Sequence, residues 1–343
     1  MRTFFIRAAA VTHYPEVARR HGLDPRRMLA RAGIARECLH DPELLIPHER
    51  AYQLLEDSVR ASGVHSFGLE MGEANKLSTL GLLGLILREE ATLRDAVQTL
   101  IHYRKLHNES VMLRLDEAAD DAILYMEFVD GAGGIQQATE QGLAMLVRSL
   151  RSLMPGWQPK WLGLTHGQLG AGEVYQRVLA APVHFNAGFN GVVFAAQALD
   201  RPLQSGDPAM VRQAKLQLDQ LLAARGAISI RDRARELVIV LLPLGRCSID
   251  QVAMHLGVHR STLHRQLAAE GCGFGEILEQ VRRRMAAQLI ASSQHSLTQI
   301  SEMLGFSSLP AFSRWHRHSF GETAQAHRKR TTLRTSRSGG GHE

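Results

Sequence analysis

The feature that most constrains this chain is a helix–glycine–helix pattern that occurs twice, 48 residues apart. In the first copy, Ser248 starts a helix with apolar residues on one face, and Gly257 ends it where a positive φ is wanted. A second helix is expected over residues 260–269, with Leu263 and Leu267 on its inner side. Two short helices joined by such a turn form a helix-turn-helix, whose second helix can enter a DNA major groove.

The second copy repeats this pattern with an aromatic core. Its parts are an apolar face (Ile300, Met303, Leu304), a turn at Gly305-Phe306, a cap at Ser307 or Ser308, and a second inner face (Phe312, Trp315). A long amphipathic helix over residues 274–291 joins the two copies. One helix-turn-helix pattern is a weak signal because many helical pairs imitate it. Two copies on one connecting helix make a strong signal.

The positive charge of the chain coincides with this repeated pattern. Residues 229–343 hold 16 Lys and Arg against 9 Asp and Glu, whereas residues 1–228 hold 24 against 25. The whole excess of +6 therefore belongs to the last third of the chain. A basic domain joined to a neutral one indicates a polyanionic partner for the basic part alone.

The outer faces of the two second helices supply the candidate DNA contacts. We expect base contacts from Ser261, His264, Arg265, Leu309, Pro310, Ser313 and Arg314, and phosphate contacts from Arg260 and Arg317. Arg265 and Arg314 are the strongest candidates, because arginine can donate two parallel hydrogen bonds to guanine. The two helices should enter successive major grooves on one face of the duplex, about 34 Å apart.

The first two hundred residues combine helix and strand patterns. Helical spacing occurs over residues 15–20, 25–32, 48–61, 93–106 and 135–153, and strand patterns over 110–115, 122–128, 161–165, 183–185 and 192–195. The first two strands should form an antiparallel hairpin. We therefore expect an α+β domain over residues 1–205, a helical connector over 206–228, an all-α DNA-binding domain over 229–330 and a disordered basic tail over 331–343. The apolar stripe of the connector, Val211 to Leu222, could pair with a second copy in a homodimer or pack on its own domain.

No pattern in the sequence points to catalysis, a cofactor or a metal. His102 and His107 are five residues apart on a predicted helix, so they make a poor metal pair, and residues 131–134 lack the Lys-Ser/Thr of a phosphate loop. Three cysteines without C-x-x-C spacing fit a reducing cytoplasm, and the longest apolar runs are too short to cross a membrane.

The alternative to a DNA-binding protein without catalytic activity is a DNA-modifying or repair enzyme with a helix-turn-helix appendage. It would be expected to carry a nucleophile or metal motif before residue 200, where we see none.

The last hundred residues resemble the DNA-binding domain of AraC/XylS family regulators. The matching stretches are Ala253-x-x-Leu-Gly-Val, Leu263-x-Arg-x-Leu, Arg282 to Leu289, Ile300, Leu304-Gly-Phe-Ser, Phe312-Ser-Arg, Phe320-Gly and His327-Arg. His259 stands where the family usually has a Ser cap, and Ala324 where a Pro usually follows. The resemblance implies a sequence-specific transcription regulator acting on promoter DNA. We expect activation in preference to repression, with RNA polymerase as a further partner, although the sequence does not decide between the two outcomes.

The N-terminal region is similar to the ligand-sensing domain of one branch of that family, called arabinose-binding-like. The matching stretches include Phe5 to Ala10, Gly22 to Pro25, Leu80 to Gly84 and Arg104 to Asn108. The similarity implies a small-molecule effector but not arabinose itself. A near-neutral domain of this size without a catalytic grouping fits such a sensor. The candidate effector contacts are His102, Tyr103, His107 and Tyr125.

Overall fold

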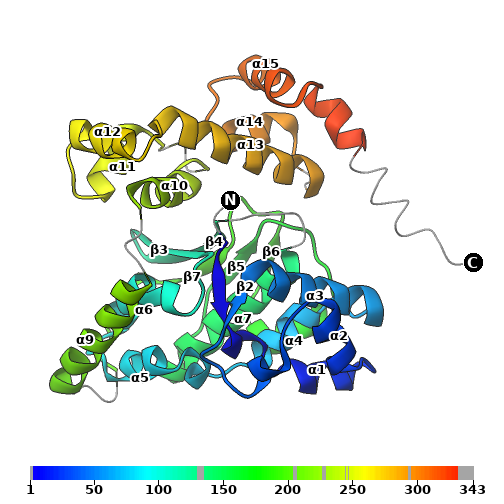
Figure 1. Cartoon of the computed structure of the whole chain (residues 1–343), viewed down its shortest axis with the longest axis vertical. Helices are drawn as coiled ribbons and strands as arrows, with labels where there is room; N and C mark the ends of the chain where they lie inside the picture. Colours follow the sequence, from blue (N-terminus) through cyan, green and yellow to red (C-terminus); the bar gives the residue numbers. More distant parts are fainter. Residues whose placement is uncertain are drawn as a thin grey trace, which may run out of the picture. The chain divides into compact units, whose positions relative to one another are not determined.

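The computed structural model describes residues 3–129, 135–203, 207–225, 229–243, 245, 247–292 and 295–330 (Figure 1). The chain divides into two compact units, the first ending at Gly226 and the second beginning at Ala227. The helix of the predicted connector therefore belongs to the first unit. The predicted tail, residues 331–343, and the predicted loop 131–134 lie outside the described residues.

The first unit is an α+β domain around a five-stranded sheet, as the sequence predicts. The strand order is β3-β4-β7-β5-β6, with β5 and β6 parallel and the other neighbours antiparallel. The strands are β3 (Val111–Ala118), β4 (Asp121–Phe128), β5 (Trp161–Leu164), β6 (Val183–Phe185) and β7 (Gly191–Ala195). The predicted hairpin is present, with Val111 opposite Phe128 and Ala118 opposite Asp121. A separate two-stranded sheet, β1 (Phe5–Arg7) with β2 (Leu45–Pro47), was not expected from the sequence.

Nine α-helices surround these sheets in the described part of the first unit. They are α1 (Tyr14–Arg20), α2 (Pro25–Arg31), α3 (His48–Ser62), α4 (Phe67–Ala74), α5 (Leu82–Glu89), α6 (Leu93–Tyr103), α7 (Gln136–Leu153), α8 (Gly172–Leu179) and α9 (Pro208–Ala224). The 3-10 turn η4 (Arg104–Leu106) continues α6 toward β3. The sequence predicts α1, α2, α3, α6, α7 and α9, but α4, α5 and α8 are too short for a distinct apolar periodicity.

Two glycines bring α4 into direct contact with α7. A Cβ atom at Gly68 would lie 2.1 Å from the carbonyl oxygen of Gln137, and one at Gly72 would lie 2.5 Å from Cβ of Ala144. Since the two glycines are four residues apart, they lie on the same face of α4. The backbones can therefore pack at a distance that larger residues would not permit. This contact fixes α7, which also forms one wall of the cavity described below.

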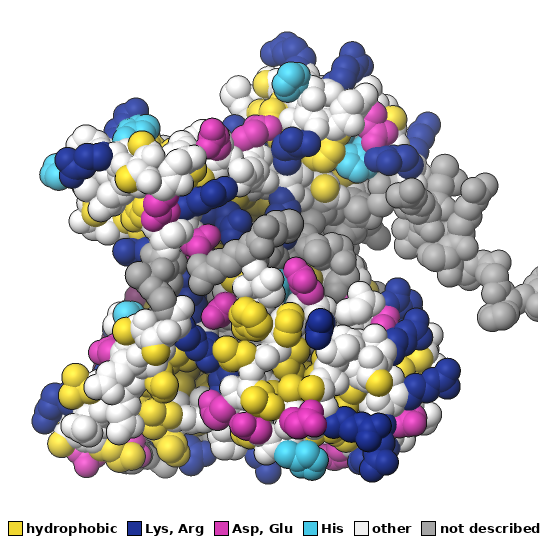
Figure 2. All heavy atoms as spheres, in the orientation of Figure 1, with side chains coloured by type: hydrophobic (Ala, Val, Ile, Leu, Met, Phe, Trp, Pro, Cys, Tyr) yellow, Lys and Arg dark blue, Asp and Glu magenta, His cyan; other side chains and the backbone are white. Residues whose placement is uncertain are grey.

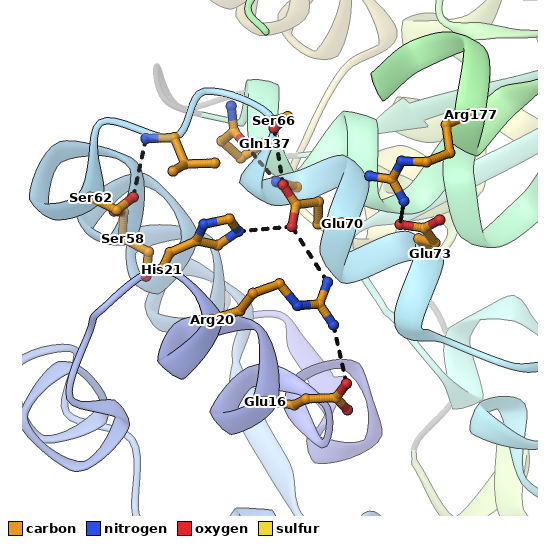
Figure 3. Close-up of polar contacts among 12 residues, drawn as sticks. Glu16, Arg20, His21, Ser58, Ser62, Ser66, Glu70, Glu73, Gln137 and Arg177 are labelled. Atoms are coloured by element: carbon orange, nitrogen blue, oxygen red, sulfur yellow. Dashed lines mark hydrogen bonds and ion pairs between the residues drawn. The ribbon is translucent and has the colours of Figure 1, made fainter. Parts of the chain in front are cut away.

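On the side of α4 that faces away from α7, a polar network connects α4 to α1 and α8 (Figure 3). The carboxylate of Glu70 lies 2.8 Å from Nε2 of His21 and 3.6 Å from the guanidinium of Arg20, and accepts a hydrogen bond from Ser66 at 3.2 Å. Arg177 of α8 pairs with Glu73 one turn further along α4. Each charged group in this network has an opposite partner, so we interpret it as structural.

Helix α9 packs on its own domain through the apolar stripe that the sequence singles out. Val211 and Leu218 of that stripe are buried in the core of the first unit. Polar contacts reinforce the packing, because Tyr103 donates a hydrogen bond to Asp219 at 2.7 Å and Lys215 pairs with Glu90 at 2.7 Å. Of the two alternatives left open for this stripe, Val211 and Leu218 therefore show the intramolecular one, whereas Leu221 is exposed.

The second unit is helical throughout its described residues. Its helices are α10 (Ile230–Leu241), α11 (Ile249–His255), α12 (Arg260–Ala269), α13 (Phe274–Ser292), α14 (Leu297–Met303) and α15 (Leu309–Phe320), followed by a short helical segment over 324–330. The predicted caps are present: Ser248 accepts a hydrogen bond from the Gln251 amide at 3.2 Å, and Ser308 caps α15. Gly257 and Gly305 both have φ of 68°, as their turns require. Within the described part of the chain, no helix is both long and apolar enough for a membrane crossing.

Candidate DNA-binding surface and ligand cavity

The first helix-turn-helix consists of α11 and α12, with α10 packed behind them. Leu263 and Leu267 of α12 are fully buried, and Val252 and Ala253 of α11 complete the core. Because these residues hold one side of α12 inward, the opposite side is presented to solvent. The predicted base contacts Ser261, His264 and Arg265 all lie on that exposed side.

The predicted phosphate contact at the start of α12 has an intramolecular partner. Arg260 is exposed and its guanidinium lies 3.4 Å from the carboxylate of Asp250 on α11. Both side chains are about 60% exposed, and ion pairs of this kind contribute little to stability. Arg260 can therefore exchange this partner for a phosphate at little cost.

The second helix-turn-helix, α14 and α15, is built around aromatic side chains. Phe312 is fully buried, and the rings of Phe306 and Trp315 lie 5.1 Å apart. Trp315, expected to be buried, is half-buried, and its Nε1 donates to the carboxylate of Glu279 on α13 at 2.8 Å. On the outer side of α15 the predicted contacts Pro310, Ser313, Arg314 and Arg317 are exposed, and Leu309 is half-buried.

Two arginines of α13 hold the second motif in place. Arg282 donates hydrogen bonds to the backbone oxygens of Leu304 at 3.0 Å and Gly305 at 3.3 Å. Arg283 donates to the backbone oxygen of Ser319 at 2.9 Å. These carbonyls belong to the end of α14 and the end of α15, where helices leave acceptors unsatisfied. Part of the basic charge of the second unit therefore has a structural role.

A groove runs beside α15 and brings further polar residues to the predicted contacts. It is lined by Leu297, Ser313, Arg314, Arg317, His318, Thr323, Ala324 and Gln325. His318 and Gln325 are not among the contacts expected from the sequence. His318 follows Arg314 by four residues, so the helical spacing could have indicated it. Figure 2 shows Lys, Arg and His side chains on the surface over α12 and α15.

Two histidines close the core of the second motif, the buried His316 and the half-buried His327. His316 donates through Nδ1 to the carbonyl of Glu322 at 3.0 Å, and its Nε2 lies 3.2 Å from Nδ1 of His327. Since Nδ1 of His316 carries its proton, Nε2 must accept from His327. Burial is the main cause that lowers the pKa of both imidazoles. The pair is therefore neutral in the folded domain near neutral pH.

The first unit contains a cavity of about 100 Å³ between α7 and the inner face of the sheet. Its apolar walls come from Ile6, Ala10, Leu80, Leu100, Val111, Leu113, Met126, Phe128, Ala138, Gly142, Met145 and Leu146. Its polar lining consists of Tyr52, Arg104, His107, Asn108, Gln141 and Ser149. An apolar cavity with a few polar groups is the usual form of a small-molecule site.

The four effector contacts expected from the sequence do not surround one space. His107 alone among them lines the cavity. Tyr103 is buried against α9, and His102 is exposed, with 4.0 Å between its Nε2 and the carboxylate of Asp219. Tyr125 lies on the opposite face of the sheet, where the guanidinium of Arg114 stacks on its ring at 4.1 Å. The hairpin register places Tyr125 opposite Arg114, and the cavity residue Met126 follows Tyr125 directly in the strand, so the two side chains point to opposite faces of the sheet.

Comparison with known families agrees with both halves of the structure. Residues 22–203 match the family described as the arabinose-binding domain of AraC transcription regulators, and residues 252–330 match a helix-turn-helix domain. The chain belongs to the AraC family. It is an AraC-type transcription regulator with an N-terminal ligand-binding domain and a C-terminal helix-turn-helix DNA-binding domain.

Relatives of similar length in the AraC family are also transcription regulators. The regulator VirS of Mycobacterium tuberculosis is 29% identical over 328 residues, which cover 94% of this chain and 96% of VirS. The ornithine utilization regulator of Pseudomonas aeruginosa is 24% identical over 318 residues, covering 88% and 93%. The crystal structure of CdpR from Pseudomonas aeruginosa aligns with 89% of this chain and 96% of its own, at 21% identity and a TM-score of 0.44.

Proposed function

We propose that this AraC-family protein reads promoter DNA with α12 and α15 and that a small molecule bound by its first unit controls this activity. The observation that carries the proposal is the same in both motifs. In each, buried side chains fix one face of the second helix and leave an arginine, a serine and further polar groups exposed on the other. Arg265 and Arg314 are assigned to guanine, with Ser261, His264 and Ser313 beside them and Leu309 and Pro310 as apolar contacts.

The phosphate contacts that we propose flank these base contacts. Arg260 starts α12 and Arg317 lies one turn beyond Arg314 on α15, where His318 extends the groove. Contacts to phosphates set the register of the protein on DNA and contribute affinity without sequence preference. Since α13 joins both motifs within one unit, the two helices are proposed to enter successive major grooves.

Effector control is supported by the end of α9, which contacts residues 104–108, the segment that lines the cavity (the cavity segment). Arg225 follows α9 and donates a hydrogen bond to the carbonyl of Lys105 at 2.7 Å. Lys105 lies two residues before His107, in the turn between α6 and β3. Residue 225 is also the last described one before the segment that leads into the second unit. A ligand that moves the turn therefore has a direct contact through which it can act on the end of α9.

We infer that the protein is a regulator and not an enzyme with a DNA-binding appendage. The inference rests on the two family matches, which are to regulator domains, and on relatives of the same length that are regulators. The regulatory outcome that we propose is activation through contact with RNA polymerase. In vitro transcription from a promoter carrying the bound site tests it, and a fall in transcript with added protein would contradict it.

A second copy of the chain is a further proposed partner. Val211 and Leu218 are buried in their own domain, so pairing would use the outer residues Met210 and Leu221 of α9, which are 47% and 52% exposed. Leu221→Arg should then give a monomer in sedimentation velocity, whereas Gln220→Arg on the same helix should not. Identical sedimentation of both variants and the parent would exclude this interface.

Hydroxyl-radical footprinting of the full chain on its promoter tests the proposed DNA contacts. We expect two protected patches on one face of the duplex, about one helical turn apart. A single patch, or protection that extends evenly along both strands, would contradict a DNA-binding unit in which both α12 and α15 enter a major groove.

A further inference from the structure

We propose that the cavity of the first unit takes a compact, largely apolar molecule that carries no positive charge and whose one hydrogen-bonding group contacts His107. This inference rests on the proposed effector control and adds the chemical class of the effector.

The walls of the cavity determine most of this class. Among the described residues of the lining, twelve of eighteen are aliphatic residues, phenylalanine, glycine or methionine, whose side chains have no hydrogen-bonding group. Burial of hydrocarbon against such walls is favourable, whereas a polar ligand surface would lose its water without compensation. A sugar, with a hydroxyl on nearly every carbon, does not match this lining.

Most polar groups of the lining are already engaged within the protein. The Asn108 amide nitrogen donates to Tyr52 at 3.0 Å, and its oxygen accepts from the Ser110 amide at 2.9 Å. Arg104 donates to the carbonyls of Val111 at 3.0 Å and Ile101 at 2.8 Å. The Gln141 amide nitrogen donates to the carbonyl of Ala10 at 2.9 Å. These groups hold the surrounding backbone and do not need a ligand.

His107 differs from them, because its Nδ1 is buried and finds no hydrogen-bond partner among the described residues. A buried nitrogen without a partner is destabilising and uncommon in native proteins. A hydroxyl or carbonyl group of a ligand beside the imidazole would satisfy it. The ring is half-buried and lines the cavity, so a ligand can reach this residue.

The charges around His107 decide the sign of the ligand. Burial lowers the pKa of His107 to about 3, and the positive charges of Arg7 and Arg225 contribute further. The imidazole is therefore neutral at physiological pH. Arg104 lines the cavity, and the described lining includes neither Asp nor Glu. An amine or a cationic amino acid would thus be buried near positive charge without a counterion.

The walls also provide a direct readout of occupancy. Met126 of β4 and Met145 of α7 line the cavity, and their methyl groups can be labelled with ¹³C. Gly142 lies beside them, and a Cβ atom at this position would be 2.8 Å from the sulfur of Met126. Gly142→Leu should therefore fill the cavity from α7. Leu113→Phe should fill it from β3, in case the first variant does not fold.

The experiment is methyl NMR of the full-length protein with two probes of equal chain length, hexan-1-ol and hexylamine. We expect hexan-1-ol to shift the Met126 and Met145 signals, and hexylamine to bind at least about tenfold more weakly. A cavity-filling variant should lose both shifts. His107→Phe should weaken hexan-1-ol binding, whereas His107→Asn, which retains a polar group near the position of Nδ1, should restore most of it.

Two results would overturn the inference: hexylamine binding as tightly as hexan-1-ol, or no response of either methionine to hexan-1-ol in the folded protein.

DNA affinity in the same samples separates this inference from effector control. If small metabolites from a cell extract change the DNA affinity of the parent and of Gly142→Leu equally, control stands and the cavity is the wrong site. If hexan-1-ol binding depends on the head group and on His107 as expected while no metabolite changes DNA affinity, the chemical class stands and control fails.

Discussion

The guanidinium of Arg282 lies 4.6 Å from the ring centre of Phe306 and donates to the carbonyls of Leu304 and Gly305. This one side chain thus holds the turn of the second helix-turn-helix against the connecting helix α13. The orientation of α15 relative to α13 depends on contacts of this kind, because α14 and α15 are short and share only a small core.

Replacement of Arg282 by Met should destabilise the second motif without removing a DNA contact. The loss of hydrogen bonds from a charged donor to two carbonyls should reduce stability by about 1.5–3 kcal/mol. Hydrogen exchange of α14 and α15 in the full chain measures the effect. Arg233→Met, on the exposed side of α10, is the matched control. Unchanged exchange in α14 would mean that Arg282 does not hold the turn.

The histidine pair His316–His327 should make the second motif sensitive to acid. Both pKa values are lowered in the folded state, so the unfolded chain binds protons more readily. The stability that the pair contributes is therefore present at neutral pH and is lost as pH falls below about 6.5. The stability of the second motif can be measured at each pH by urea unfolding. The fluorescence signal comes from a variant that retains Trp315 as its only tryptophan. His327→Gln should flatten the profile, whereas the exposed His318→Gln should leave the acid sensitivity intact.

The carboxyl group of Glu140 should have the opposite effect on the first unit. Burial raises its pKa to about 8, although Tyr175 donates a hydrogen bond to it. Because the folded state binds the proton more tightly, the stability that Glu140 contributes should fall as pH rises from about 4.5 toward 8, by up to about 1.4 kcal/mol per pH unit. Glu140→Gln should remove this decline in thermal unfolding measurements, and the exposed Glu49→Gln should not. A stability difference between the parent and Glu140→Gln that stays constant over this interval would contradict the assignment.

Arg225 should stabilise two segments at once. In Arg225→Met the hydrogen bond to Lys105 is lost, so amide exchange should increase both in the last turn of α9 and in residues 104–108. Arg212→Met, an exposed substitution on the same helix, should increase neither. An increase confined to α9 would show that the helix end does not constrain the cavity segment.

Local signals predicted the second unit well. The caps at Ser248 and Ser308 and the left-handed Gly257 and Gly305 act over three or four residues, so the sequence contains the whole interaction. The exposed faces of α12 and α15 follow from the same periodicity. The roles of Arg282 and Arg283 could not be predicted, because their partners lie 22 to 36 residues away.

The first unit shows where such reasoning fails. His102, Tyr103 and His107 are close in sequence, but helix α6 ends between them and turns them toward different surroundings. Only the tertiary structure reveals which of them reaches the cavity. Helix α4 was not expected either, because its glycines suit close packing on α7 and not helix formation by themselves.

In vitro selection of binding sites for the parent, Arg265→Ala and Arg314→Ala tests the central claim most directly. The parent should select two half-sites about one helical turn apart. Each variant should lose preference at one base pair, in a different half-site, by about 1–3 kcal/mol. Arg317→Ala, which removes a proposed phosphate contact, should weaken binding to all sequences and reduce its salt dependence while the selected motif is unchanged. If Arg265→Ala and Arg314→Ala select the same motif as the parent, α12 and α15 do not read the bases and the account is wrong.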